Sequence, residues 1–157
     1  GCWVACHDDV DSMSRGRENT TKYLTEIFVP NEGMKVKEQA ELDAMRAAGK
    51  YLEYWQARLN PGAEAVPVDG TILEKRAENT TPVVKVDATR SQAGVWTVTF
   101  ARKLVAGSGH KDIVPGKIYN IGFSIHAGHT AKRFHYVSFE RTLTLDSGAA
   151  DFVAAAN

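Results

Sequence analysis

Alternation of hydrophobic and polar residues dominates the second half of the chain. Within 95–103, large apolar side chains occupy every second position and threonines stand between them, which is the period of a half-buried β-strand. Similar alternation or short apolar runs predict further strands at 23–29, 71–76, 82–88, 118–126 and 134–145. Because turn residues separate these short strands, the pattern predicts a mainly β fold arranged as an antiparallel β-sandwich.

One stretch follows a different period. Apolar residues recur at steps of three and four, as Met45, Ala48, Leu52, Trp55 and Leu59. This spacing places them on one helical stripe and predicts one long helix over about 36–59, ended by Asn60-Pro61-Gly62. Such a stripe packs into a core or covers a large flat apolar cofactor.

Size and charge set the limits. A chain of 157 residues fits a single domain, 1–157: an attachment segment at 1–22, the sandwich at 23–145, and an Ala-rich tail at 146–157 that frays or forms one helical turn. Lys plus Arg and Asp plus Glu both number 19, so nothing favours nucleic acid as a partner. The sequence has no apolar run of about 18 residues, and this chain is not expected to cross a membrane itself.

The first seven residues carry the most specific chemistry. Cys2 and Cys6 are separated by three residues, and His7 follows directly. Two cysteines and an adjacent histidine are typical of covalently attached haem c, in which the thiols bind the haem vinyl groups and the histidine ligates iron; the common spacing is two residues. A local disulfide, a zinc half-site and two unrelated thiols are the alternatives, although zinc would need two further ligands.

Covalent haem also predicts a compartment. Haem is attached to cysteines outside the bacterial cytoplasm, so the motif favours the periplasm. The chain has no start methionine and no signal peptide of its own. We therefore expect a longer parent with an export signal or a membrane anchor before Gly1.

The sixth iron ligand has several candidates, of which His135 is the first. It shares the apolar face of its predicted strand with Val137, Phe139 and Leu143. A buried imidazole without a partner costs about 1–3 kcal/mol, and iron would remove that cost. A core histidine bonded to a carbonyl is the alternative. Met13 offers a thioether but lies only six residues from His7.

His126 is the main rival of His135. It lies on a face of small residues with Gly122 and Ser124, on which a haem could lie flat. His129 and His110 are expected to be exposed loop residues, with His129 a weaker candidate ligand. The residues alone leave the choice between His135 and His126 open.

Several longer segments resemble a known family. These are Gly49-Lys50-Tyr51-Leu52-Glu53-Tyr54-Trp55, Asp69-Gly70-Thr71-Ile72-Leu73-Glu74-Lys75-Arg76, Gly94-Val95-Trp96-Thr97-Val98-Thr99-Phe100-Ala101-Arg102, Tyr119-Asn120-Ile121-Gly122-Phe123-Ser124-Ile125-His126 and Arg133-Phe134-His135-Tyr136-Val137-Ser138. The chain resembles the haem-binding domain related to the haem subunits of ethylbenzene dehydrogenase and dimethylsulfide dehydrogenase.

The resemblance implies a β-sandwich that holds one haem and exchanges electrons with partner redox proteins. Those subunits bind haem non-covalently through a methionine and a lysine, and His135 matches the lysine position. The covalent motif departs from them and is similar to a branch joined to membrane-anchored multihaem cytochromes that oxidise quinol. His7 would then replace the methionine ligand.

These observations predict an electron-transfer cytochrome domain with one haem c, bound by Cys2, Cys6, His7 and either His135 or His126. A multihaem quinol-oxidising cytochrome or a molybdenum oxidoreductase would be the redox partner. No nucleophile elbow, phosphate loop or HExxH motif indicates an enzyme. The alternatives are a sensory β-sandwich that binds haem or a small ligand, and a structural sandwich whose cysteines form a disulfide.

Overall fold

The computed structural model describes residues 25–32, 35–107, 109–126, 135–138, 141–146 and 148–155. The chain divides into two compact units, Gly1–Glu38 with Ile113–Asn157, and Gln39–Asp112, and each is described here by itself. Strands predominate in both, and their pairing is antiparallel except between β9 and β10. The predicted mainly β class is confirmed, while the sandwich arrangement and the single domain stay predictions.

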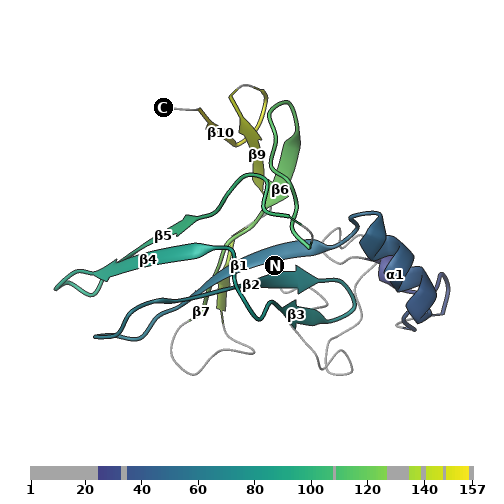
Figure 1. Cartoon of the computed structure of the whole chain (residues 1–157), viewed down its shortest axis with the longest axis horizontal. Helices are drawn as coiled ribbons and strands as arrows, with labels where there is room; N and C mark the ends of the chain where they lie inside the picture. Colours follow the sequence, from purple (N-terminus) through teal and green to yellow (C-terminus); the bar gives the residue numbers. More distant parts are fainter. Residues whose placement is uncertain are drawn as a thin grey trace. The chain divides into compact units, whose positions relative to one another are not determined.

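A three-stranded antiparallel sheet organises the unit Gln39–Asp112. It contains β1 (Leu52–Arg58), β2 (Val66–Ile72) and β3 (Arg76–Glu78) in the order β1-β2-β3 (Figure 1). The central strand β2 carries Val68, Asp69 and Ile72, all buried. The predicted strand 71–76 therefore covers the turn between β2 and β3 rather than one strand.

The predicted long helix is wrong in its second half. Helix α1 spans only Gln39–Ala47 and buries Leu42 and Met45. Its end is built by Gly49, which has φ 73° and donates from its N–H to the carbonyl of Arg46 at 3.0 Å. A glycine in the left-handed region is the usual residue just past a helix C-terminus. The chain then enters β1, so Leu52 and Trp55 belong to a strand.

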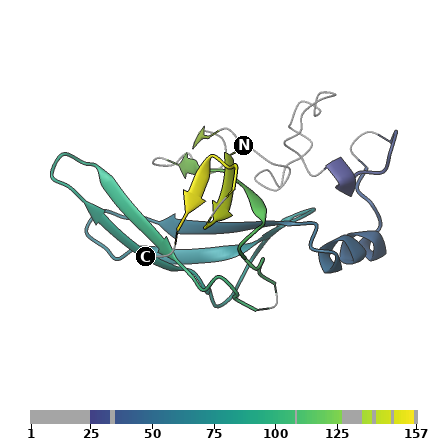
Figure 2. The same ribbon diagram turned by 90° about the horizontal axis from the view of Figure 1, so that it is seen from above.

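Strands β4 (Lys85–Arg90) and β5 (Trp96–Ala101) form an antiparallel hairpin in the same unit (Figure 2). Between them Gly94 has φ 84°, and the Ser91 N–H donates to the Val95 carbonyl at 2.8 Å. Val84, directly before β4, is buried. The predicted strands at 82–88 and 95–103 are confirmed to within a few residues at each end.

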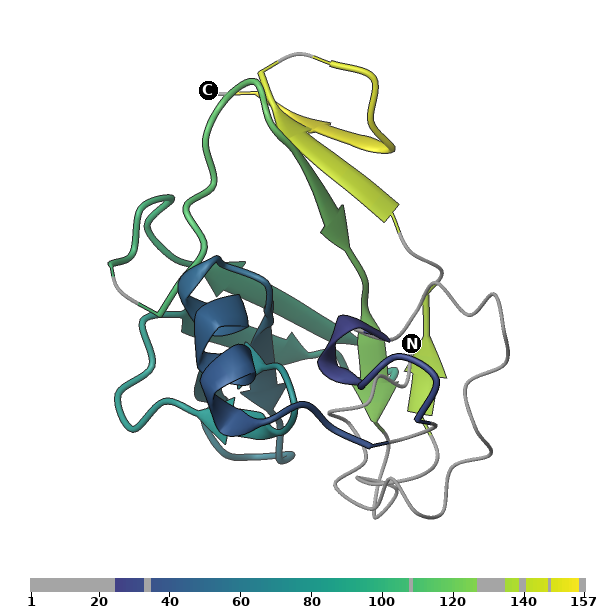
Figure 3. The same ribbon diagram turned by 90° about the vertical axis from the view of Figure 1, so that its right-hand side faces the viewer.

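In the other unit, β6 (Ile118–Ile121), β9 (Arg141–Leu145) and β10 (Phe152–Ala154) form a sheet in the order β10-β9-β6 (Figure 3). β10 runs parallel to β9. The tail was expected to fray or form a helical turn, and for its described residues this is wrong. Asp151 explains the difference, because its carboxylate accepts hydrogen bonds from the N–H and hydroxyl of Thr142 at 2.8 and 2.9 Å.

Two short strands of this unit form a separate hairpin, β7 (Ser124–His126) with β8 (His135–Val137). The predicted strands at 118–126 and 134–145 are thus each divided in two. At the division, the Phe123 N–H donates to Ser138 Oγ at 2.9 Å, and the Ser138 N–H donates to the Phe123 carbonyl at 2.9 Å. These bonds continue the β7–β8 ladder while β6 pairs with β9 instead.

The predicted strand at 23–29 is wrong where it can be followed. Thr25–Ile27 forms a short 3-10 helix, η3, and Ile27 is fully buried. Phe28 then makes an isolated bridge to Val36. A turn at Pro30 and Asn31 follows soon after Phe28, so the pairing is limited to this one bridge.

Candidate functional site

The predicted haem-binding residues divide into two groups. Cys2, Cys6, His7, Met13 and His129 lie outside the described residues. His126 and His135 are described as the last residue of β7 and the first of β8. Of the predicted site, the structure therefore describes only the two rival second ligands, His126 and His135.

His126 and His135 occupy directly opposed positions in the antiparallel β7–β8 ladder. The next opposed pair on the same face is Ser124 with Val137. Opposed residues of an antiparallel pair belong to one face of the ladder. The two rival ligands, which the sequence assigned to different faces of different strands, therefore belong to one face of one hairpin.

The structure also changes which residues belong to the same strand as His135. Leu143 was expected on the same strand face, but it lies in β9, which pairs with β6 and β10 and not with β7. That expectation is wrong because the chain changes sheets between Val137 and Arg141. Val137 remains on the face of His135, two residues along β8.

The other face of the hairpin is apolar. Ile125 and Tyr136 are opposed in the ladder, and their exposed fractions are 67% and 79%. Near its start, the ring of Phe123 meets that of Phe152 edge to face, with centroids 6.4 Å apart. Ile125 and Tyr136 thus lie on the opposite face of the ladder from positions 126 and 135.

A second group of polar residues lies in the unit Gln39–Asp112, and no motif or spacing in the sequence indicated it. Glu53 on β1 and Arg102 after β5 form an ion pair at 2.6 Å, with side chains only 8% and 1% exposed. The Glu53 carboxylate also accepts from Trp55 Nε1 at 2.8 Å and from the Lys111 N–H at 2.6 Å. Buried charges need such partners.

His110 belongs to this buried group. Its Nδ1 lies 3.2 Å from Glu53 Oε1, and its side chain is only 6% exposed. The expectation of an exposed loop histidine is therefore wrong. A carboxylate on a strand far away in sequence holds the imidazole, and no local pattern around His110 could have indicated this.

Burial around this group shifts two pKa values. Desolvation lowers the pKa of Lys111, although Glu53 opposes the shift. Its Nζ donates to the Gly49 carbonyl at 2.6 Å and lies 4.4 Å from the centroid of the Tyr51 ring. Desolvation, followed by the nearby charge of Glu53, raises the pKa of Tyr51. Lys111 has a carbonyl partner in Gly49, and Arg102 has a carboxylate partner in Glu53. The cluster therefore connects the segment after β5 to β1 and to the turn before it.

Asp69 is a fully buried carboxylate on β2. Burial alone would raise its pKa, but hydrogen bonds from the Val84 N–H at 2.9 Å, Asn79 Nδ2 at 2.7 Å and the Val83 N–H at 2.7 Å outweigh it. The pKa of Asp69 is therefore below its usual value. This carboxylate fastens the segment before β4 to β2.

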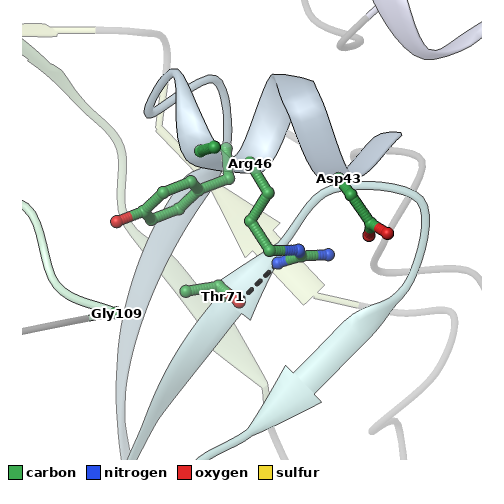
Figure 4. Close-up of a pocket in the computed structure, with 6 residues that line it drawn as sticks. Asp43, Arg46, Thr71 and Gly109 are labelled. Carbon is green, nitrogen blue, oxygen red and sulfur yellow. Dashed lines mark hydrogen bonds between the residues drawn. The ribbon is translucent and has the colours of Figure 1, made fainter. Parts of the chain in front are cut away.

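A shallow open depression of about 400 Å³ lies between α1 and β2 in the same unit. Figure 4 shows Arg46 extending from α1 toward Thr71, and its Nη1 donates to the threonine hydroxyl at 3.2 Å. Its Nη2 forms an ion pair with Glu74 at 3.0 Å. Because the cation is already paired, the depression has the character of a structural joint rather than a binding site.

The described residues contain no group of three or more His, Cys, Asp or Glu side chains placed to hold a metal ion. The pair at 126 and 135 supplies imidazole nitrogen, which is a usual axial donor to haem iron. The donor chemistry of this residue type therefore fits haem iron, which either histidine could hold. In the described part of the chain, no helix is long and apolar enough to cross a membrane.

Comparisons with known proteins point to one class, the c-type cytochromes. The chain is 31% identical over 148 residues to cytochrome c-552 of Stutzerimonas stutzeri, which covers 94% of the chain and 44% of that protein. It is 26% identical over 155 residues to cytochrome c-551 of Rhodocyclus tenuis, covering 99% of the chain and 47% of that protein. The chain thus spans less than half the length of each of these curated relatives. No family model and no solved structure matches it.

Proposed function

We propose that this chain is an electron-transfer segment of a c-type cytochrome, with one haem bound covalently through Cys2 and Cys6. The observation that carries the proposal is the Cys-x-x-x-Cys-His motif at the start of a chain that is similar, over 94% of its length, to a cytochrome c-552. The attachment residues alone would also fit a disulfide or a zinc half-site. The similarity favours haem over both.

His7 and His135 are the proposed iron ligands. His7 directly follows Cys6, so it would hold the iron of a haem attached through the two cysteines. His135 is the proposed second ligand, because its position matches that of the lysine ligand in the haem subunits that the chain resembles. When bound, the haem supplies one-electron redox chemistry. The neutral imidazole of each histidine orients the group and completes its ligand set.

Two filled axial positions favour electron transfer over small-molecule sensing. A sensor needs an open or easily displaced sixth position, whereas His7 and His135 would together fill both iron positions. The haem subunits of ethylbenzene and dimethylsulfide dehydrogenases remain the family to which we relate the fold. Catalysis by this segment itself is not part of the proposal.

The proposed setting is the periplasm, where covalent haem attachment takes place. The proposed partner is a redox protein: either a multihaem quinol-oxidising cytochrome or a molybdenum oxidoreductase. A partner would be identified by following electron transfer between the purified proteins.

Absorption spectroscopy tests the assignment of an electron-transfer haem. The chain is produced in the periplasm of a host that matures cytochromes c, and its spectrum is recorded before and after dithionite. We expect a six-coordinate low-spin spectrum in both states and no reaction of the ferrous form with carbon monoxide. A high-spin spectrum with ready carbon monoxide binding would favour the sensor, and a colourless protein would overturn the haem assignment.

A further inference from the structure

The two strands of the β4–β5 hairpin carry very different residues. β4 contains three charged side chains, Lys85, Asp87 and Arg90, whereas β5 contains no charged residue and no proline. Charged residues and proline are the usual means by which a protein keeps an edge strand from pairing with another chain. In the part of the chain that the structure describes, β5 pairs with β4 alone. Among these residues, its outer edge is therefore unpaired and lacks such protection.

The turn of the hairpin determines which backbone groups of β5 point to that outer edge. The Ser91 N–H donates to the Val95 carbonyl at 2.8 Å, so these two residues form a hydrogen-bonded pair that continues the β4–β5 register. Bonded and non-bonded pairs alternate along an antiparallel ladder. Every second residue of β5 therefore turns its N–H and C=O groups away from β4. These residues are Trp96, Val98 and Phe100.

The residue pattern of β5 is the same in both directions from Val98. A threonine stands one position to each side, Thr97 and Thr99, and an aromatic residue two positions to each side, Trp96 and Phe100. An antiparallel pair of two β5 strands centred on Val98 therefore opposes threonine to threonine and aromatic to aromatic, which are favourable cross-strand pairs. In this register all three outward-pointing residues of each strand bond to the other strand. A shift by two residues would leave some of them without a partner.

We propose that β5 binds β5 of a second copy of this chain, antiparallel and about a twofold axis at Val98. A twofold contact requires a surface that complements itself, and the symmetry of β5 about Val98 meets this requirement. The charges agree with it, because residues 95–101 carry none and the guanidinium of Arg102, which follows, is paired with Glu53 at 2.6 Å. The contact is small, so the dimer should be weak and reversible. Haem takes no part in this contact.

Sedimentation velocity of the full chain tests the dimer. We expect the mass to rise from that of the monomer toward twice that value as the concentration increases to about 1 mM, which populates a dimer with a dissociation constant in the micromolar range. Val98→Pro removes an outward N–H without removing a bond of the β4–β5 ladder, and this variant should stay monomeric. Its matched control, Val98→Thr, keeps the N–H and a β-branched side chain, and it should dimerise like the unsubstituted chain.

Two double variants test the register itself. Thr97 and Thr99 are both exposed, and the proposed axis places Thr97 of one copy opposite Thr99 of the other. Thr97→Lys with Thr99→Lys therefore opposes like charges at two places, whereas Thr97→Glu with Thr99→Lys opposes unlike charges there. We expect the dissociation constant of the first variant to exceed that of the second by about tenfold or more. Within each copy Thr99→Lys faces Asp87 in both variants, so this contact is matched.

Three results would overturn the proposal. A monomer at every concentration would leave the edge to a strand of another protein, and a dimer that survives Val98→Pro would lie elsewhere on the chain. Equal dissociation constants for the two charged variants would show a different register. Far-UV circular dichroism first establishes that each variant is folded. If Val98→Pro is not, the two charged variants decide, because their substitutions lie on the exposed face of β5 and leave its backbone unchanged.

Discussion

Two ion pairs in the unit Gln39–Asp112 have the same length but very different surroundings, and they allow a prediction about burial. Glu53 and Arg102 meet at 2.6 Å with side chains 8% and 1% exposed, whereas Glu78 and Arg58 meet at 2.6 Å with side chains 44% and 48% exposed. Removing one partner of a buried pair strands a charge and costs about 3–5 kcal/mol. An exposed pair contributes about 0–1 kcal/mol.

We therefore expect Glu53→Ala to lower the free energy of unfolding by about 3–5 kcal/mol, and Glu78→Ala by about 1 kcal/mol or less. Several hydrogen bonds support the larger figure. The Lys111 N–H, 2.6 Å from the Glu53 carboxylate, would lose its partner, and Arg102 already has one buried nitrogen, Nε, without a partner among the described residues.

Urea unfolding followed by far-UV circular dichroism at neutral pH measures both losses. Stabilities of small domains are about 5–15 kcal/mol, so the Glu53→Ala protein should show a clearly lower midpoint. Adding Arg102→Met to Glu53→Ala should recover part of the loss, since the stranded cation is then gone. If Glu53→Ala and Glu78→Ala differ by less than about 1 kcal/mol, the argument from burial fails.

Two further substitutions test other parts of the same unit. The pKa of Asp69 is lowered in the folded chain, so its contribution to stability is complete above the unfolded pKa of about 3.9 and is lost as the pH falls through the folded pKa. Urea unfolding at several pH values should therefore show a smaller loss of stability at acid pH for Asp69→Asn than for the unsubstituted chain. An unchanged loss at acid pH would contradict the assignment. Gly70→Ala would drive a Cβ into the carbonyl oxygen of Ala77 and to 2.8 Å from the Tyr54 hydroxyl, so thermal unfolding should show a loss of about 1–3 kcal/mol. The control Gly122→Ala meets nothing nearer than 3.8 Å and should change little; equal losses would refute the steric argument.

Strand alternation was enough to predict the fold class and the hairpin β4–β5. The pattern failed where residues of a strand happened to continue the spacing of a helix. Leu52 and Trp55 continue the helical spacing of Met45, yet they lie in β1 beyond a glycine with positive φ. Gly49 was visible in the sequence, but a glycine can either weaken a helix or end it. Here it ends the helix because the residues that follow pair with β2, beginning with Leu52 opposite Ile72.

The candidate site shows the same limit. The sequence identified His135 by its expected apolar strand face and His126 by its face of small residues, but it could not predict that they oppose each other. Register depends on which residues pair, and here Ser138 sets it by bonding with Phe123. The partnership of His110 with Glu53 was likewise hidden, since 57 residues separate them.

Covalent attachment of haem is the central claim, and the intact mass of the denatured chain tests it most directly. The chain is matured in a host that attaches haem, and non-covalent haem is removed with acid and acetone. We expect a mass increased by one haem, which peptide mapping locates to the segment with Cys2 and Cys6. The increase should be absent from the Cys2→Ala/Cys6→Ala variant. A native chain with the unmodified mass, or the mass of a chain with a Cys2–Cys6 disulfide, would contradict it.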